Sequence, residues 1–283
     1  MLRSLAILPL LLAALAPSVA LEAPFHGDAD PTLAAWLPAG LDCLLPVQLP
    51  LPPDSPTEAL PEPTAQTCSG IRPGAKFSNR GCTMAFVLTD LTDTYVATAG
   101  HCVREGQRMS AHGVGAFGTV VFDSDGLDRD FALIKVDADK RGLVNPAMCR
   151  WGGPTTMGAP GVPGALYRVY GWGGETRHHD DTRARSGVEL MPPNALLAWE
   201  GRVSPGDSGG PVMSADGRAM GVMIVTARLG LGSVGGEPLT VGAGVGTSLA
   251  SGLALAQAAG IGPLVVVPGG PLRVPDPTDL PEL

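Results

Sequence analysis

Residues 206–211 read Gly-Asp-Ser-Gly-Gly-Pro, and no other part of the chain constrains its architecture and chemistry as strongly. The glycines allow a tight turn in which the backbone N–H groups of Gly206 and Ser208 converge on one point. The same turn leaves the Ser208 hydroxyl sterically accessible. A serine hydroxyl is a poor nucleophile at neutral pH until a base takes its proton, so the turn requires a base and an acid from elsewhere in the chain.

Two further motifs supply a candidate base and a candidate acid. Residues 98–102 read Thr-Ala-Gly-His-Cys and end a predicted strand, so a rigid element presents His101 at the edge of that strand. Residues 130–135 read Asp-Phe-Ala-Leu-Ile-Lys, an acid immediately before an apolar strand. Asp128 is a nearby competitor, but Asp130 directly abuts the strand and is favoured. Such a carboxylate holds the histidine in the tautomer that can accept the serine proton.

The three motifs follow one another in the order His, Asp, Ser, and over residues 68–260 the chain resembles the chymotrypsin-like (trypsin-fold) serine proteases. The spacings, 29 residues from His101 to Asp130 and 78 onward to Ser208, are more similar to those of the compact bacterial secreted members. The resemblance implies an all-β fold of two six-stranded antiparallel β-barrels with a C-terminal helix. It also implies a serine endopeptidase that forms an acyl-enzyme, with these three residues as its triad and the N–H groups of Gly206 and Ser208 as its oxyanion hole.

The residue pattern elsewhere is compatible with this fold. Short runs rich in β-branched and aromatic residues alternate with Gly, Pro and Asp, as is typical of sandwiches and barrels. The predicted strands are 83–88, 94–98, 118–123, 131–136, 166–170, 188–190, 195–199, 211–213, 219–226 and 239–245. One helix is predicted from Ser248 to Ala259, with Ser248 as its cap and Gly260 as its end. The Gly-rich stretch 229–236 is expected to be a flexible loop.

The five cysteines are Cys43, Cys68, Cys82, Cys102 and Cys149. Their spacing fits no zinc pattern, and in an exported protein disulfides are the default expectation. The resemblance implies a Cys82–Cys102 disulfide beside the catalytic histidine, which closes a loop of about 20 residues and contributes about 3 kcal/mol. By the same resemblance, Cys149 ties the domain to an N-terminal segment. Its partner is Cys68 or Cys43, with Cys68 favoured.

The acid before the nucleophile raises the question of activation. In animal members of the family, cleavage of a zymogen creates an Ile-Val-Gly-Gly amino terminus that pairs with this acid, which is Asp207 here. No such sequence exists in this chain. An internal arginine does the same work in compact bacterial members, and Arg168, just before the family-like Gly171-Trp172-Gly173, is a candidate.

The pocket for the substrate side chain is predicted from the same alignment. Trypsin-like cleavage after Lys or Arg requires an acid about six residues before Ser208, and that place holds Arg202 and Val203 instead. We therefore expect non-tryptic specificity. Thr226 and Arg228 are expected in the wall of the pocket. Two alternatives stay open: the arginines favour acidic side chains, or they point to solvent and the pocket accepts small or apolar groups.

The ends of the chain predict export. Residues 1–20 combine a basic start, a short apolar run and a small-residue cleavage site, the pattern of a removed signal peptide rather than an anchor. Residues 21–67 are Pro-rich and are expected to be a propeptide or linker, and the Pro-rich tail 263–283 is expected to be flexible. The mature protein is thus expected to be secreted or periplasmic. Its protease domain is predicted at 68–262, with barrel one at about 68–150, barrel two at about 155–247 and the helix at 248–259.

The net charge and the remaining motifs restrict the classes of partner and ligand that we expect. The net charge of −8 argues against nucleic acid, so the expected partners are protein or peptide substrates of a monomer without a membrane anchor. We predict no cofactor and no metal, because the adjacent His178 and His179 fit a solvated loop better than an ion site. The alternative function is a catalytically inactive, protease-like binding protein. An α/β-hydrolase esterase is disfavoured by the order of the triad and the lack of β-α alternation.

Overall fold

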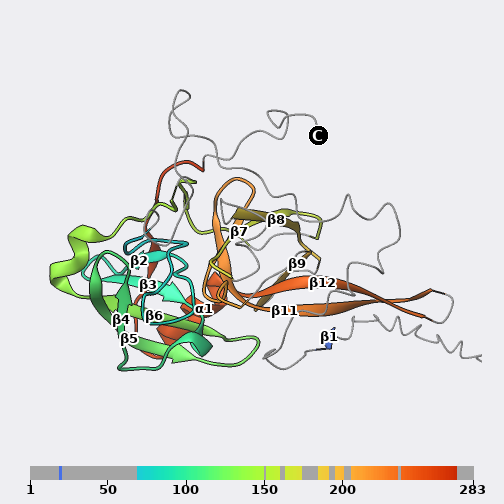
Figure 1. The fold of residues 1–283 in the computed structure, drawn as a ribbon, viewed down its shortest axis with the longest axis horizontal. Helices are drawn as coiled ribbons and strands as arrows, with labels where there is room; N and C mark the ends of the chain where they lie inside the picture. The colour runs from blue at the N-terminus through green and yellow to red at the C-terminus, as the bar shows by residue number, and fades with distance from the viewer. Residues whose placement is uncertain are drawn as a thin grey trace, which may run out of the picture.

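The structure is a computed structural model that describes residues 69–149, 151–159, 163–173, 184–190, 195–200, 205–234 and 237–272, with the short strand β1 (Val19–Ala20) (Figure 1). Side chains are described at all of these positions except 19–20, 184–186, 226–234 and 237–242. Two antiparallel sheets hold nearly all of the regular structure, and one helix packs against them (Figure 1).

The first sheet has six strands in the order β13-β2-β3-β6-β5-β4. Their bounds are β2 Val87–Thr89, β3 Thr94–Thr98, β4 Arg108–Ala111, β5 Gly115–Ser124, β6 Phe131–Val136 and β13 Val265–Val266. Isolated bridges from Lys76 to Thr83 and from Phe77 to Ala111 link the two ends of this sheet through residues 76–83. Because β3 and β6 are paired neighbours, the segments next to them in sequence are brought together in space.

The second sheet runs β8-β7-β10-β11-β12-β9, and β1 pairs with the outer edge of β11. Its bounds are β7 Leu166–Tyr170, β8 Ala184–Val188, β9 Leu196–Glu200, β10 Pro211–Ser214, β11 Ala219–Val234 and β12 Glu237–Ser248. A bridge from Glu189 to Trp199 joins the β8 end of the sheet to the β9 end. The predicted fold class, all-β with two six-stranded antiparallel units and a C-terminal helix, is confirmed.

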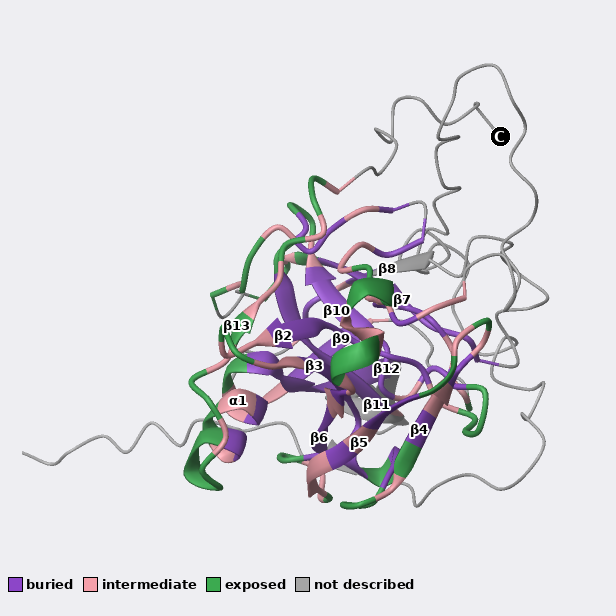
Figure 2. Ribbon diagram, turned by 90° about the vertical axis from the view of Figure 1, so that its left-hand side faces the viewer, coloured by how far each residue is buried: buried purple, intermediate pink, exposed green. Residues whose placement is uncertain are grey.

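Buried residues concentrate on the strands in the middle of the molecule (Figure 2). The larger core cluster is centred on the first sheet, with Phe77 and Phe117 stacked at 6.4 Å. The smaller cluster fills the inside of the second sheet and includes Tyr167, Trp199 and Met223. Residues at the junction of the two sheets are therefore supported by packed side chains from both sheets.

Helix α1 spans Leu249–Ala258 and follows β12 directly. The hydroxyl of Ser248 accepts a hydrogen bond from the Ser251 N–H at 3.2 Å, as the predicted cap requires. Gly260 follows with a φ of +89°, which ends the helix at low steric cost. Among the described residues, no helix combines the length and the hydropathy needed to cross a bilayer.

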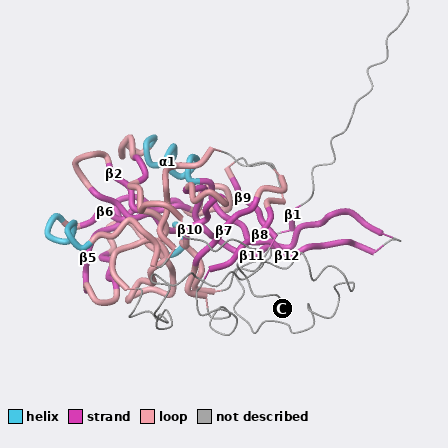
Figure 3. Tube along the Cα trace, turned by 90° about the horizontal axis from the view of Figure 1, so that it is seen from above, coloured by secondary structure: helices cyan, strands magenta, loops and turns pink. Residues whose placement is uncertain are grey.

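The hairpin of β11 and β12 is longer than the sequence pattern suggested. The predicted strands end at 226 and begin at 239, with a flexible loop at 229–236, whereas the structure continues β11 to Val234 and begins β12 at Glu237 (Figure 3). Gly230 and Gly232 pair with Thr240 and Leu239. Cross-strand pairing therefore overrides the low strand propensity of glycine here, which local sequence cannot show.

The segment after the helix also differs from its prediction as a flexible tail. Val265 and Val266 of β13 pair with Thr89 and Leu88. Leu264 and Leu272 pack against the first core cluster. The part of the tail up to Leu272 thus belongs to the body of the first sheet, because its apolar side chains cover buried surface there.

Candidate active site

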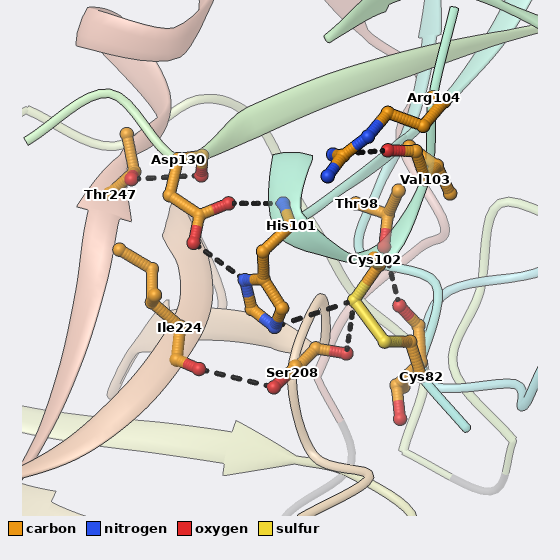
Figure 4. Close-up of polar contacts among 11 residues, drawn as sticks. Cys82, Thr98, His101, Cys102, Val103, Arg104, Asp130, Ser208, Ile224 and Thr247 are labelled. Carbon is orange, nitrogen blue, oxygen red and sulfur yellow. Dashed lines mark hydrogen bonds and ion pairs between the residues drawn. A yellow bond between two sulfur atoms is a disulfide. The ribbon is translucent and has the colours of Figure 1, made fainter. Parts of the chain in front are cut away.

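His101 lies at the end of β3, in a short 3-10 turn over Gly100–Cys102. Its ring Nδ1 lies 2.6 Å from Oδ2 of Asp130, and its backbone N–H donates to Oδ1 of the same carboxylate at 2.9 Å (Figure 4). Asp130 immediately precedes β6, and the β3–β6 pairing of Thr98 with Ala132 explains why the two motifs meet. The carboxylate thus holds both the main chain and the ring of the histidine.

Asp130 and Asp128 differ in burial and in their contacts with His101. Asp130 is only 3% exposed, whereas Asp128 is exposed and makes no contact with the histidine among the described residues. Thr247 of β12 donates its hydroxyl to the Asp130 carbonyl at 2.9 Å, so the second sheet also fixes the acid. A Cβ on Gly100 would lie 2.0 Å from the Ser124 carbonyl oxygen, which explains why glycine precedes His101.

The His101 ring is poised to act as a base. Burial lowers its pKa, but the hydrogen bond and the negative charge of Asp130 raise it by more, so the net pKa lies above the usual value of 6.5. Asp125 adds to the rise and Arg104 opposes it. The side chain is still 36% exposed, so a substrate can approach the ring from solvent.

Ser208 lies in the turn between the second sheet and His101. Its hydroxyl donates to the Ile224 carbonyl at 3.1 Å, and within the described residues no hydrogen bond joins it to His101 Nε2. The Cys102 Sγ atom lies 3.7 Å from His101 Nε2 and 3.8 Å from the Ser208 carbonyl oxygen, so the base and the turn meet at this sulfur (Figure 4). A rotation of the hydroxyl toward Nε2 is needed before proton transfer, as is common without substrate.

The turn at 206–210 contains glycines at positions where other residues would not fit. Gly206 and Gly209 have φ values of +107° and +86°, in the left-handed region that favours glycine. A Cβ on Gly209 would lie 2.2 Å from Thr98 Oγ1 and 2.3 Å from the Thr83 carbonyl oxygen. In the described part of the chain, the N–H groups of Gly206 and Ser208 donate to no acceptor, which leaves both free for an oxyanion.

Thr83 is a contributor that sequence reasoning missed. Its hydroxyl donates to the Gly206 carbonyl at 2.8 Å, and its N–H donates to the Ser208 carbonyl at 2.8 Å. The same hydroxyl accepts from the Trp172 N–H at 3.2 Å. Thr83 belongs to the first half of the molecule, so these bonds fasten the nucleophile turn to the half that carries His101. Its place at the start of a predicted strand carried no signal of this role.

Asp207 is fully buried, and its Oδ1 accepts a hydrogen bond from the Gly173 N–H at 2.7 Å. A Cβ on Gly171 would lie 2.3 Å from the same oxygen, so the Gly171-Trp172-Gly173 motif is needed for this close approach. Arg168, the candidate internal cation, is also buried, and burial lowers its pKa. Both side chains make further interactions, and Arg168 remains a candidate for the internal cation.

The predicted Cys82–Cys102 disulfide is confirmed, with a sequence separation of 20. Cys149 is also disulfide-bonded, to a partner outside the described residues, so the choice between Cys68 and Cys43 stays open. The one group of three potential metal ligands in the described chain is Cys82, His101 and Cys102. Its two sulfurs are joined to each other and therefore are not thiolate ligands.

The predicted pocket residues are only partly covered. Arg202 and Val203 lie outside the described residues, as do His178 and His179. Thr226 and Arg228 lie on β11, opposite Gly244 and Gly242 of β12, and only their backbone is described.

The chain is similar to known peptidases. The family model for the trypsin-like peptidase domain matches residues 83–222, which include all three motifs. Protease A of Thermobifida fusca has a similar structure, with 22% identity, a TM-score of 0.50, and coverage of 70% of this chain and 99% of that one. A Nocardiopsis protease has 19% identity and a TM-score of 0.49 over 69% of this chain and 98% of its own. A glutamic acid-specific serine protease has 20% identity and a TM-score of 0.49 over 70% and 100%. No curated protein matches the chain significantly in sequence.

Proposed function

The chain carries the trypsin-like peptidase domain of the serine endopeptidases on a chymotrypsin-like fold, and we propose that Ser208, His101 and Asp130 form its working triad. The observation that supports this most is the double contact of Asp130 with the main chain and ring of His101. A buried acid that orients an accessible imidazole beside a tight Gly-Asp-Ser-Gly turn is the arrangement that nucleophilic acyl transfer needs.

The proposed reaction proceeds through an acyl-enzyme. The Ser208 hydroxyl leaves the Ile224 carbonyl, transfers its proton to His101 Nε2 and attacks the substrate carbonyl carbon. The oxyanion that forms is stabilised by the N–H groups of Gly206 and Ser208. His101 then gives its proton to the leaving amine, and a water attacks the acyl-enzyme by the same route in reverse.

The shape of the oxyanion turn does not depend on a new amino terminus in this proposal. Thr83 holds the Gly206 and Ser208 carbonyls, and Gly173 holds the Asp207 carboxylate. These bonds come from inside the domain, so the turn is formed before any cleavage of the chain. Export from the cytoplasm is part of the proposal: the signal-like residues 1–20 and the Cys82–Cys102 disulfide both favour an oxidising compartment.

The test is covalent labelling of the folded protein with a fluorophosphonate, followed by mapping of the adduct. We expect labelling at Ser208 that is lost in His101→Ala. Ser208→Ala is expected to reduce peptide hydrolysis by roughly 10⁶-fold without changing the melting temperature appreciably. Folded protein that neither takes the label nor cleaves peptides would support the alternative of an inactive, protease-like binding protein.

A further inference from the structure

Strand β11 of the second sheet passes next to Ser208 at Ile224. The Ser208 hydroxyl donates a hydrogen bond to the Ile224 carbonyl, and the Gly209 N–H donates to the Met223 carbonyl at 2.8 Å. A Cβ on Gly210 would lie 2.4 Å from Met223 Cε, so the nucleophile turn lies against the face of β11 that carries the Met223 side chain. An acyl group on Ser208 therefore projects its side chain over this face of the sheet.

The same face lacks side chains on the neighbouring strand. Met223 pairs with Gly246 of β12, and Gly244 lies two residues earlier, so both glycines share the face of Met223. Gly244 in turn pairs with Trp199 of β9. Because two alternate positions carry no side chain, a trough is left in this face of the sheet. The side chain of a bound substrate residue would enter the trough if nothing else occupied it.

The indole of Trp199 fills this trough. A Cβ on Gly244 would lie 2.4 Å from Trp199 Cε2 and 2.5 Å from Cζ2, and a Cβ on Gly246 would lie 3.4 Å from Cζ3. A Cβ on Gly187 would lie 2.7 Å from Cδ1 on the other side of the ring. The ring is 1% exposed and meets Tyr167 edge-on at 6.4 Å, which holds it in place.

Along the row of paired residues that contains Trp199, the described acid is Glu189, and it lies far from β11. Glu189 bridges Trp199 on the side away from β12 and is 2% exposed. The row from Glu189 through Trp199 and Gly244 to β11 crosses three strand spacings, roughly 14 Å at the usual separation of strands. Trp199 and Met223, which share this face and are both buried, contribute an indole and a thioether, neither of which carries a charge.

We propose that Trp199 is a specificity-determining residue: its indole closes the trough next to Ser208 and restricts the residue on the acyl side of the cleaved bond to small apolar side chains such as Ala and Val. This inference rests on the proposed function, because it assumes attack by Ser208. It selects the small or apolar alternative over the acidic one.

The test is a series of peptide substrates that differ only in the residue before the cleaved bond: Ala, Val, Phe, Lys and Glu. For the unaltered protein we expect kcat/KM for Ala or Val to exceed that for the other three by at least about 10-fold. Trp199→Leu is expected to raise the Phe-to-Ala ratio of kcat/KM by about 10-fold or more, because it opens the trough. In Trp199→Ala, added indole is expected to restore the original ratio.

Trp151→Leu is the matched control, since Trp151 is equally buried and also meets a tyrosine, Tyr170, edge-on at 6.1 Å. It is expected to lose stability without any change in the ratio. Preferred cleavage after Phe, Lys or Glu by the unaltered protein, or an unchanged ratio in Trp199→Leu, would overturn the inference even if the fluorophosphonate labels Ser208. Absence of that label would instead reject the proposed function. If Trp199→Leu does not fold, the substrate profile of the unaltered protein still decides the matter, with Trp199→Phe as the milder variant.

Discussion

The two halves of the proposed active site are held in different ways. On the first sheet, His101 and Asp130 are joined by a side-chain contact and a backbone hydrogen bond, and the acid is buried. Next to the second sheet, the Ser208 hydroxyl donates a hydrogen bond to the Ile224 carbonyl, which takes no part in the proposed chemistry. Thr83, from the other half, holds the turn through a hydrogen bond to the Gly206 carbonyl. The acid–base pair is therefore preorganised, whereas the nucleophile must exchange one hydrogen bond before it reacts.

This difference predicts which substitutions should reduce catalytic activity most. Changes on the first sheet should damage proton transfer itself, because the base depends on a single acid. Changes around the turn should instead damage the position of the nucleophile and of the oxyanion donors by smaller amounts, because several bonds share that task.

The largest effect among changes to these supports is expected from Asp130→Asn. The amide cannot hold His101 in the tautomer that accepts the serine proton, so kcat is expected to fall by about 10⁴-fold. Steady-state kinetics with one peptide substrate measures this, and KM should change little. A fall of less than about 10-fold would show that Asp130 does not orient the base.

The disulfide joins the acid–base half to the segment that leads to Thr83. Replacement of Cys82 and Cys102 by Ala together is expected to lower the free energy of unfolding by about 3 kcal/mol, from the loop of 20 residues that it closes. Urea denaturation of both proteins measures the difference. Equal midpoints and slopes would contradict a stabilising role for this bond.

Thr83→Val tests the link between the halves. Valine keeps the shape but removes the hydroxyl that donates to Gly206 and accepts from Trp172, so we expect kcat to fall by about 10-fold as the oxyanion turn loosens. Thr98→Val is the matched control: it removes a buried hydroxyl that donates to the Thr83 carbonyl and makes no described hydrogen bond to the turn. Equal loss of kcat in the two variants would argue against a specific role for Thr83.

The smallest expected effect concerns pH. His101 must be neutral to accept a proton, so kcat/KM is expected to fall as pH decreases through the pKa of the ring. Because Asp130 raises that pKa, the midpoint should lie above 6.5 in the unaltered protein. It should be lower in Asp130→Asn, provided that the residual activity still depends on His101. An acid limb with its midpoint below 6.5 in the unaltered protein would show that the charge of Asp130 does not dominate the site.

Several elements of the fold could be predicted from the sequence because the residues that define them are neighbours in the chain. The bounds of β3, β6 and β7 match their predicted runs, and the Ser248 cap of the helix was visible in the residues around it. The hairpin of β11 and β12 was predicted too short, because its glycines are poor strand formers until a partner strand is present. The same limit applied to β13, a two-residue strand whose pairing with β2 has no local signature.

The sequence alone was sufficient for the three motifs, their order, the fold class and the pairing of Cys82 with Cys102. The motifs and their order depend on residue identity and on spacing along the chain, whereas the fold class and the cysteine pairing were implied by the family resemblance that the motifs carry. Only the tertiary structure showed that Thr83 fastens the nucleophile turn, that the Ser208 hydroxyl is bonded to Ile224, and that Trp199 fills the space left by Gly187, Gly244 and Gly246. Each of these joins residues far apart in sequence, and such contacts arise from the packing of strands whose register no local pattern encodes.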